Sequence, residues 1–264
     1  MTTKFSNFFL TNLPITLAGT TLTAFLTVLP QPVEAISLVT NRANLGANDS
    51  LDWSSLGKVF NPFAPDPTKF LSNSFDATSQ RGLGLNVNIP VAPPNTPPFV
   101  FQTLPFPQGI PTNFASGDFI LFTGILPPPN PFPAIGNPGP LTITFANPVF
   151  AAGTQIAVDD ALQPYTAFIS AYDINNNLLG TFSTIASSSI ALDNSAQFLG
   201  VRSDTANISK IVFSSSVPQR AFGINDLSIA VIPEPTSVLG TFALGTLGAS
   251  WLIAKRRKPA KVLR

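Results

Sequence analysis

The sequence contains no cysteine and no histidine in its 264 residues. Without cysteine there can be no disulfide bonds, so a folded domain must be held together by its hydrophobic core or by bound ions. Without histidine, the Ser-His-Asp and Cys-His catalytic triads are excluded. Together the two absences remove the preferred ligands of zinc, haem and thiolate-bound metals.

Glutamate is almost as scarce, since Glu34 and Glu234 are the two in the chain. Residues 36–231 carry eleven aspartates against seven lysines and arginines, a formal charge of −4, although the whole chain is +1. An acidic segment without a basic patch predicts no nucleic-acid partner. A glycosidase needs two carboxyl groups around one bond, one with a raised pKa, and nothing in the sequence defines such a pair. We therefore predict that the protein is not an enzyme.

Residues 237–254 contain no charged side chain. A helix of that length spans about 27 Å, enough for a hydrocarbon core, so we predict one C-terminal transmembrane helix there. The tail that follows, residues 255–264, holds six of the fourteen basic residues and no acid. Because short basic tails stay on the cytoplasmic side, its first residues predict a cytoplasmic stop. Those residues are Lys255, Arg256, Arg257 and Lys258.

Pro233, Glu234 and Pro235 stand directly before the predicted helix. Two prolines so close together disfavour a helix interior or a central strand, so this stretch should be extended and accessible. The order of a Pro-Glu-Pro motif, a hydrophobic helix and a short basic end closely resembles the PEP-CTERM sorting signal of Gram-negative bacteria, cyanobacteria included. The resemblance covers residues 233–258.

This resemblance implies recognition by exosortase, a membrane transpeptidase-like enzyme, which removes the helix and the tail. The precursor would be held in the inner membrane by residues 237–254, and the product would reach the cell surface or the exopolysaccharide matrix. Pro233, Glu234 and Pro235 would then be a substrate motif and not a catalytic site.

The N-terminus fits the same destination. Lys4 supplies one positive charge, residues 13–29 are largely apolar, and Val33, Glu34 and Ala35 offer a small-residue cleavage site before Ile36. These features are typical of a secretory signal peptide, which we predict over residues 1–35. Export followed by sorting leaves residues 36–231 as the ectodomain and residues 232–264 as the sorting signal.

The ectodomain is long enough for one large domain or two small ones. Residues 36–140 are rich in proline and predict long loops with brief extended pieces at 86–89, 99–104 and 118–123. Asp52 and Trp53 predict an early strand before a turn. We expect this half to pack on the second half, because so few strands cannot bury a core alone.

Residues 141–231 show the clearest strand pattern. Leu141, Ile143 and Phe145 alternate with threonines, which places them on one face of a strand. Turn signals separate the expected strands, among them Ala152-Gly153 and residues 175–177. The predicted strands are 141–145, 155–158, 167–172, 178–185, 198–202, 208–213 and 222–230. Seven short strands at this spacing predict an all-β protein with a β-sandwich fold.

The end of this segment also carries a resemblance. Residues 198–201, 208–213 and 222–229 resemble the closing strands of jelly-roll ectodomains that are common in PEP-CTERM proteins. Those domains are similar in layout to carbohydrate-binding modules. The resemblance therefore implies a jelly-roll-like sandwich over residues 141–230.

Three aspartates are candidate calcium ligands, because calcium prefers oxygen ligands. Asp159 and Asp160 are expected at the end of one strand, and Asp226 in the last strand. Neighbouring residues of a strand point to opposite faces, so at most one of Asp159 and Asp160 can join a common site. The alternative is that all three are ordinary loop carboxylates. No cofactor other than this structural calcium ion is expected.

Trp53 and Tyr165 are candidate sugar contacts, because their rings have flat apolar faces and polar tips. The alternative is that strand aromatics such as Trp53 belong to the core, while Tyr165 is expected in a loop. The preferred hypothesis is an exported, non-enzymatic surface or matrix protein with a structural or adhesive role. The alternatives are a carbohydrate-binding module for an extracellular glycan and, more distantly, an exported hydrolase.

Overall fold

The computed structural model describes residues 35–61, 63–126, 135–159 and 163–232. The chain divides between Val33 and Glu34, and all described residues belong to the second part. The predicted signal peptide, Pro-Glu-Pro motif, transmembrane helix and basic tail fall almost wholly outside these ranges. Within them, no helix is long and apolar enough to cross a membrane.

Most of the regular secondary structure of the described residues is β-strand. Three short 3-10 helices lie in the N-terminal half: η1 (Arg42–Leu45), η2 (Trp53–Leu56) and η3 (Pro67–Lys69). The strands are β1 (Ile36–Val39), β2 (Asp49–Leu51), β3 (Ser74–Thr78), β4 (Gly84–Asn88), β5 (Phe99–Gln102), β6 (Phe119–Phe122), β7 (Leu141–Val149), β8 (Ala151–Val158), β9 (Pro164–Tyr172), β10 (Leu178–Ser187), β11 (Gln197–Ser203), β12 (Ile208–Ser215), β13 (Phe222–Ile224) and β14 (Leu227–Ala230). The prediction of an all-β protein is confirmed.

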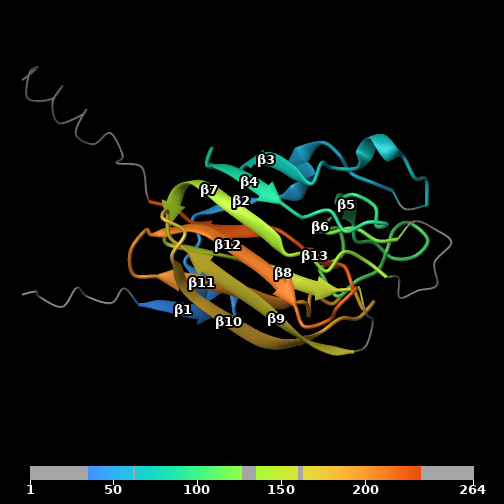
Figure 1. Cartoon of the computed structure of the whole chain (residues 1–264). Coiled ribbons are helices and arrows are strands. Elements are labelled where there is room, and N and C mark those ends of the chain that lie inside the picture. Colours follow the sequence, from blue (N-terminus) through green and yellow to red (C-terminus); the bar gives the residue numbers. More distant parts are fainter. Residues whose placement is uncertain (1–34, 62, 127–134, 160–162, 233–264) are drawn as a thin grey trace, which may run out of the picture. The chain divides into compact units, whose positions relative to one another are not determined.

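The strands form two antiparallel sheets (Figure 1). The eight-stranded sheet A has the order β1-β11-β8-β13-β6-β5, and β14 pairs with both β2 and β8. The six-stranded sheet B has the order β10-β9-β12-β7-β4-β3. Two sheets packed face to face on one core are a β-sandwich, as the sequence predicts.

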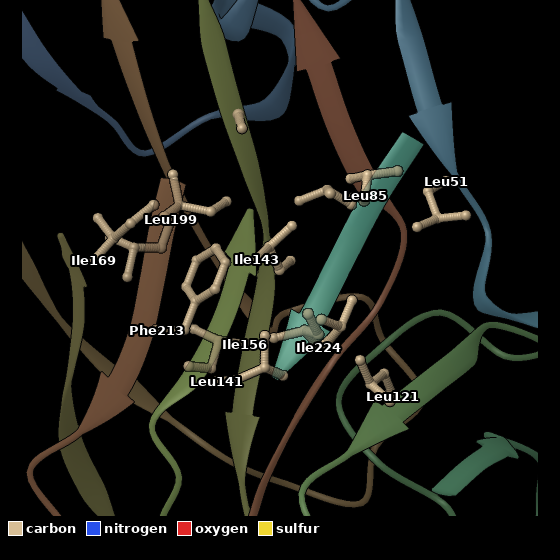
Figure 2. Close-up of a cluster of buried hydrophobic side chains, with 14 of the residues drawn as sticks. Leu51, Leu85, Leu121, Leu141, Ile143, Ile156, Ile169, Leu199, Phe213 and Ile224 are labelled. Carbon is tan, nitrogen blue, oxygen red and sulfur yellow. The ribbon is translucent and has the colours of Figure 1, made fainter. Parts of the chain in front are cut away.

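The main core lies between the two sheets. The alternation in β7 turns Leu141, Ile143 and Phe145 inward, where they are buried. Figure 2 shows Leu141 and Ile143 among side chains from both sheets, including Ile156 of β8 and Phe213 of β12. Burial of this apolar surface is the main source of stability, because the sequence has no cysteine to form cross-links.

The outer face of sheet A is also covered, which explains why every residue of β8 is buried. Ile156 and Val158 belong to the main core, while Ala157 belongs to a second apolar cluster with Phe99, Phe101 and other residues. A third cluster, around Leu45 and Phe198, covers the other end of this face. Strands buried on both faces give continuous apolar runs instead of an alternating pattern.

The N-terminal half contributes more strands than the sequence predicts. Strands β1, β2, β5 and β6 belong to sheet A, and β3 and β4 belong to sheet B. The expectation that this half packs on the second half is correct, but it does so by extending both sheets. The three extended pieces expected at 86–89, 99–104 and 118–123 correspond to β4, β5 and β6.

Three local predictions are wrong. Ala152 and Gly153 lie inside β8 and not in a turn, because Gly153 faces Gly200 of β11 and lets the two backbones approach closely. Trp53 begins the helix η2 and is not in a strand. The single strand expected over 222–230 is interrupted at Asn225 and Asp226, which separate β13 from β14.

The segment 36–231 carries its own hydrophobic core. Every strand pairing and every core cluster described here is formed by residues within these limits. Its last residue is held by Asn48, whose side-chain amide donates to the carbonyl oxygen of Val231 at 3.1 Å. The Oδ1 atom of Asn48 accepts the backbone N–H of Val231 at 2.9 Å.

Candidate functional site

Trp53 is completely buried, at 0% exposure. Asp52 caps the helix η2 by accepting the N–H of Ser54 at 2.8 Å, and this cap turns the indole ring into the core. The indole Nε1 donates to the carbonyl oxygen of Asn225 at 2.8 Å. The prediction of Trp53 as a sugar contact is therefore wrong, because neither ring face reaches the surface.

Tyr165 is also buried, at 4% exposure. It lies in β9 and not in a loop, at one of the inward-facing positions of that strand. Its hydroxyl group donates to the carbonyl oxygen of Ile156 at 2.8 Å, and burial raises the pKa of the phenol well above its usual value of 10.0. The prediction of Tyr165 as a sugar contact is wrong for the same reason as for Trp53.

The structure does not bring the candidate calcium ligands together. Asp159 directly follows β8, Asp160 lies outside the described residues, and Asp226 lies between β13 and β14. Strand register places Asp226 beside Thr154 and Gln155, four positions along β8 from Asp159, which is about 13 Å. Among the residues that the structure describes, no group of three or more acidic side chains is arranged to hold a metal ion. Asp159 and Asp226 therefore do not share a site.

Arg42, which the sequence did not single out, fills the break between β13 and β14. Its Nη1 donates to the carbonyl oxygen of Asp226 at 3.0 Å and to Oγ of Ser228 at 2.7 Å. Its Nη2 donates to Oδ1 of Asn225 at 2.8 Å. The guanidinium group thus occupies the acceptors that an interrupted ladder leaves free.

The network continues to the acidic side chains nearby. Asn225 donates through Nδ2 to Oδ2 of Asp118 at 2.9 Å and to Oε1 of Gln155 at 2.6 Å. Burial raises the pKa of Asp226 to about 6, the carboxylates of Asp52 and Asp118 add to this, and Arg42 opposes it. Burial also lowers the pKa of Arg42, whose charge is balanced by Asp226 and Asp118. This arrangement is a hydrogen-bonded joint between η1, β8 and the break that separates β13 from β14.

A cavity of about 250 Å³ lies on the outer face of sheet A, under the second apolar cluster. Its floor is a row of paired residues across four strands. Ala157 of β8 pairs with Gly223 of β13, Gly223 pairs with Phe122 of β6, and Phe122 pairs with Phe99 of β5. Paired residues of antiparallel strands point to the same side of the sheet, so the two smallest members leave space beside the two aromatic rings.

The aromatic residues of the cavity lining belong to a continuous cluster. The ring centroids of Phe99 and Phe122 are 5.3 Å apart, and those of Phe101 and Phe122 are 5.9 Å apart with nearly perpendicular planes. Phe60 extends the cluster at 4.8 Å from Phe99. Such edge-to-face and tilted contacts hold the rings in fixed positions.

Two loops cover the cavity. Residues 110–114 lie on one side and residues 188–190 on the other, and both contribute lining residues. Ile190 is exposed, and Ile110, Thr112 and Ser189 are half-buried, so the opening lies between these loops. The lining is mainly apolar, with a small number of polar groups, which is the usual composition of a small-molecule site.

Asn113 is the most unusual residue of the cavity lining. It is 1% exposed, and its Nδ2 donates to the carbonyl oxygen of Ser187 at 2.9 Å. Its Oδ1 has no hydrogen-bond donor among the described residues. The contact to a carbonyl oxygen fixes which end of the amide is the donor, so the unsatisfied atom is an acceptor.

The sequence contains one signal for this cavity. Residues 99–101 and 119–122 are continuous apolar runs, and such runs indicate strands covered on both faces. Asn113, the buried polar residue of the cavity lining, has no comparable signal in the sequence, because it lies in a loop whose position depends on the tertiary fold.

Comparisons with known proteins do not assign a family. No protein-family model matches the chain, and no curated protein matches it. Among solved structures, the fold is similar to the crystal structure of a DUF4465 family protein from Bacteroides caccae, with 13% sequence identity and a TM-score of 0.37. The match covers 73% of this chain and 99% of the other. A likeness of this size carries no information on function.

Proposed function

We propose that this chain is an exported β-sandwich protein of the cell surface or the exopolysaccharide matrix. In this proposal exosortase processes it at Pro233-Glu234-Pro235, and the released domain has a structural or adhesive role without catalysis. The observation that carries the proposal is the order of the motif, the uncharged residues 237–254 and the basic residues 255–258. The jelly-roll-like layout of the ectodomain is part of the same proposal.

The limits of the folded domain support this proposal. Strand β1 begins at Ile36, which is the first residue after the predicted signal cleavage. Strand β14 ends at Ala230, and Asn48 holds Val231 with two hydrogen bonds. One exposed residue, Ile232, then separates the domain from Pro233. Cleavage at either end would therefore leave every described strand in place.

The two alternatives have less support than the proposal, because the glycan-binding alternative has lost both of its candidate residues and the hydrolase has none assigned. A glycan-binding module has no stacking platform at Trp53 or Tyr165, because both rings are buried. A hydrolase would need an accessible carboxyl pair in a cavity, and among the described residues Asp159 is the one acidic residue that lines the cavity, whereas Asp226, whose pKa is raised, does not line it. The proposed role therefore requires neither an active site nor a bound metal.

The substitution Glu234→Ala tests the sorting step. We expect the wild-type protein to lose its C-terminal segment in a host that makes exosortase, and the variant to remain in the membrane at precursor mass. Ile232→Ala is the matched control, because Ile232 is exposed and lies two residues before Glu234. If Glu234→Ala is processed and released like the control, the proposal is wrong.

A further inference from the structure

We infer that two copies of this domain associate through strand β10, which pairs antiparallel with β10 of the second copy about a two-fold axis. This inference does not depend on the proposed export route. It depends on the open edge of β10, on the absence of charge along that edge and on the aliphatic side chains exposed beside it.

Strand β10 is the last strand of sheet B and pairs with β9 alone (Figure 1). Among the described residues, residues 179–186 form no backbone hydrogen bond other than those with β9. The open stretch ends at Ser187, whose carbonyl oxygen accepts Nδ2 of Asn113 at 2.9 Å. The unpaired N–H and C=O groups of such an edge are a template for another strand.

The other edge strands are short or protected. Strands β1, β2, β3 and β5 have three to five residues each, whereas β10 has ten. The carbonyl oxygen of Val100 in β5 already accepts the N–H of Phe60 at 2.7 Å, and β3 carries the charge of Asp76. Strand β10 has neither a charged residue nor a proline, which are the usual means of blocking an edge. Among the described strands, β10 is therefore the long edge that is left open.

Exposed aliphatic side chains lie along the same edge. Ile185 of β10 is 76% exposed, and Leu178 at its start is 57% exposed. Ile174 and Ile190 lie in the loops at the two ends of the strand and are also exposed. These are four of the ten large hydrophobic side chains that the described residues expose. Such a concentration on one edge is typical of a surface that a protein partner covers.

The open part of β10 is centred on Ser183. The pairing with β9 is irregular between Leu178 and Gly180. Because Asn113 occupies the carbonyl oxygen of Ser187, the regular open part is residues 180–186, and Ser183 is its middle residue. A two-fold axis at Ser183 therefore pairs the whole open part with itself in antiparallel register.

This register opposes compatible side chains, which is why a second copy fits the edge. Thr181 of one copy faces Ile185 of the other, and both residues are β-branched. Phe182 faces Thr184, and the two copies of Ser183 face each other. No like charges meet, because the strand has none. The same residues thus serve both partners, as a two-fold interface requires.

Sedimentation of the segment 36–232 over a range of concentrations tests the association. We expect a monomer–dimer equilibrium without larger species, because two-fold pairing leaves no β10 edge free. Ser183→Glu places two carboxylates directly opposite each other, so it should weaken the dimer by at least about fivefold. Ser183→Thr is the matched neutral control and should keep the dimer. Ser183 is exposed, so neither variant disturbs the core.

A mixture of charged variants separates strand pairing from a general effect of charge. Ser183→Lys alone should weaken the dimer like Ser183→Glu, whereas the two variants mixed in equal amounts should form a heterodimer. Thr144→Glu is the control for charge, because Thr144 is exposed on β7 in the interior of the same sheet. This variant should associate like the wild-type segment.

A cysteine at position 183 tests the register. The chain has no cysteine, so Ser183→Cys carries a single thiol. Directly opposed residues of antiparallel strands have Cα atoms about 4.5–5.5 Å apart, which is within the range of a disulfide. We expect Ser183→Cys to form a covalent dimer under mild oxidation, and Thr144→Cys to remain monomeric under the same denaturing analysis.

Three results would overturn the inference. A wild-type segment that stays monomeric up to about 1 mM, where even a weak complex forms, would show that the edge of β10 does not associate. A dimer that Ser183→Glu and Ser183→Lys both leave unchanged would place the interface elsewhere. Growth into species larger than a dimer would contradict two-fold closure at β10.

Discussion

The indole Nε1 of Trp53 donates a 2.8 Å hydrogen bond to the carbonyl oxygen of Asn225, a residue 172 positions later in the chain. This bond joins the helix η2 to the break between β13 and β14. Arg42 approaches the same break and bonds the side chain of Asn225. The first residues of the domain are thus fixed to its last two strands.

The substitution Trp53→Phe tests this joint. It removes a buried donor and leaves a small void, while the carbonyl oxygen of Asn225 keeps the bond from Oγ1 of Thr154 at 2.9 Å. We expect a loss of about 1–3 kcal/mol in the free energy of unfolding, measured by urea denaturation of the segment 36–232. Val91→Ala, an exposed control, should change the free energy by less than about 0.5 kcal/mol. Equal stability of the two variants would contradict the role given to Trp53.

The substitution Arg42→Met should lower the free energy of unfolding by more than Trp53→Phe does. It leaves the carbonyl oxygen of Asp226 and the side chains of Asn225 and Gln155 without their cationic donor. We expect a loss of about 2–4 kcal/mol in the free energy of unfolding, with partial recovery in Arg42→Lys. Arg81→Met, at an exposed position, is the matched control and should be nearly neutral.

The raised pKa of Asp226 predicts a pH dependence. The carboxyl group titrates at 3.8 when unfolded and at about 6 when folded, so the folded protein binds more protons between these values. The contribution of Asp226 to stability is therefore highest below about pH 4 and falls as the pH rises to about 6. Because Asp226 is half-buried, we expect a change of about 1 kcal/mol after solvent screening.

The substitution Asp226→Asn should flatten this change in urea denaturation at the two pH values. Asp66→Asn is the control, because hydrogen bonds from Thr68 lower the pKa of that exposed carboxyl group and place its titration below the window. A wild-type protein that gains stability between pH 4 and 6, or an unchanged slope in Asp226→Asn, would refute the assignment.

The close approach of β8 and β11 gives a further prediction. A Cβ atom added at Gly153 would lie 2.5 Å from Cα of Gly200 and 3.0 Å from the carbonyl oxygen of Leu199. Both neighbours are backbone atoms, so Gly153→Ala should cost about 1–3 kcal/mol in the free energy of unfolding. Gly84→Ala is the control, because its added Cβ would meet Cβ of Ala146 at an ordinary 3.4 Å.

The sequence predicts the sandwich but not the candidate site. The alternation of Leu141, Ile143 and Phe145 survives in β7 because one face of sheet B is buried and the other is exposed. In β8 both faces are covered, so alternation is lost and Ala152-Gly153 has the residue types of a turn. An alternating pattern identifies a strand with one buried and one exposed face. It is absent where a second layer of residues covers the outer face of the strand.

The side chains of the site depend on tertiary contacts that no local pattern contains. Trp53 and Tyr165 have the residue types of a sugar platform, but their polar tips bond carbonyl oxygens inside the core. Asn113 and Ala157 meet in one cavity because strand β8 and the loop at 110–114 are brought together by the fold. Residue type alone does not distinguish side chains that are buried in the core, such as Trp53 and Tyr165, from side chains that line a cavity, such as Asn113 and Ala157.

The most direct measurement is the intact mass of the protein recovered from the surface fraction of its native host. The proposal predicts a species that begins at or near Ile36 and ends close to Pro233-Glu234-Pro235, without residues 237–264. A species that retains residues 237–264 would show a plain membrane anchor and would contradict sorting and processing at this motif.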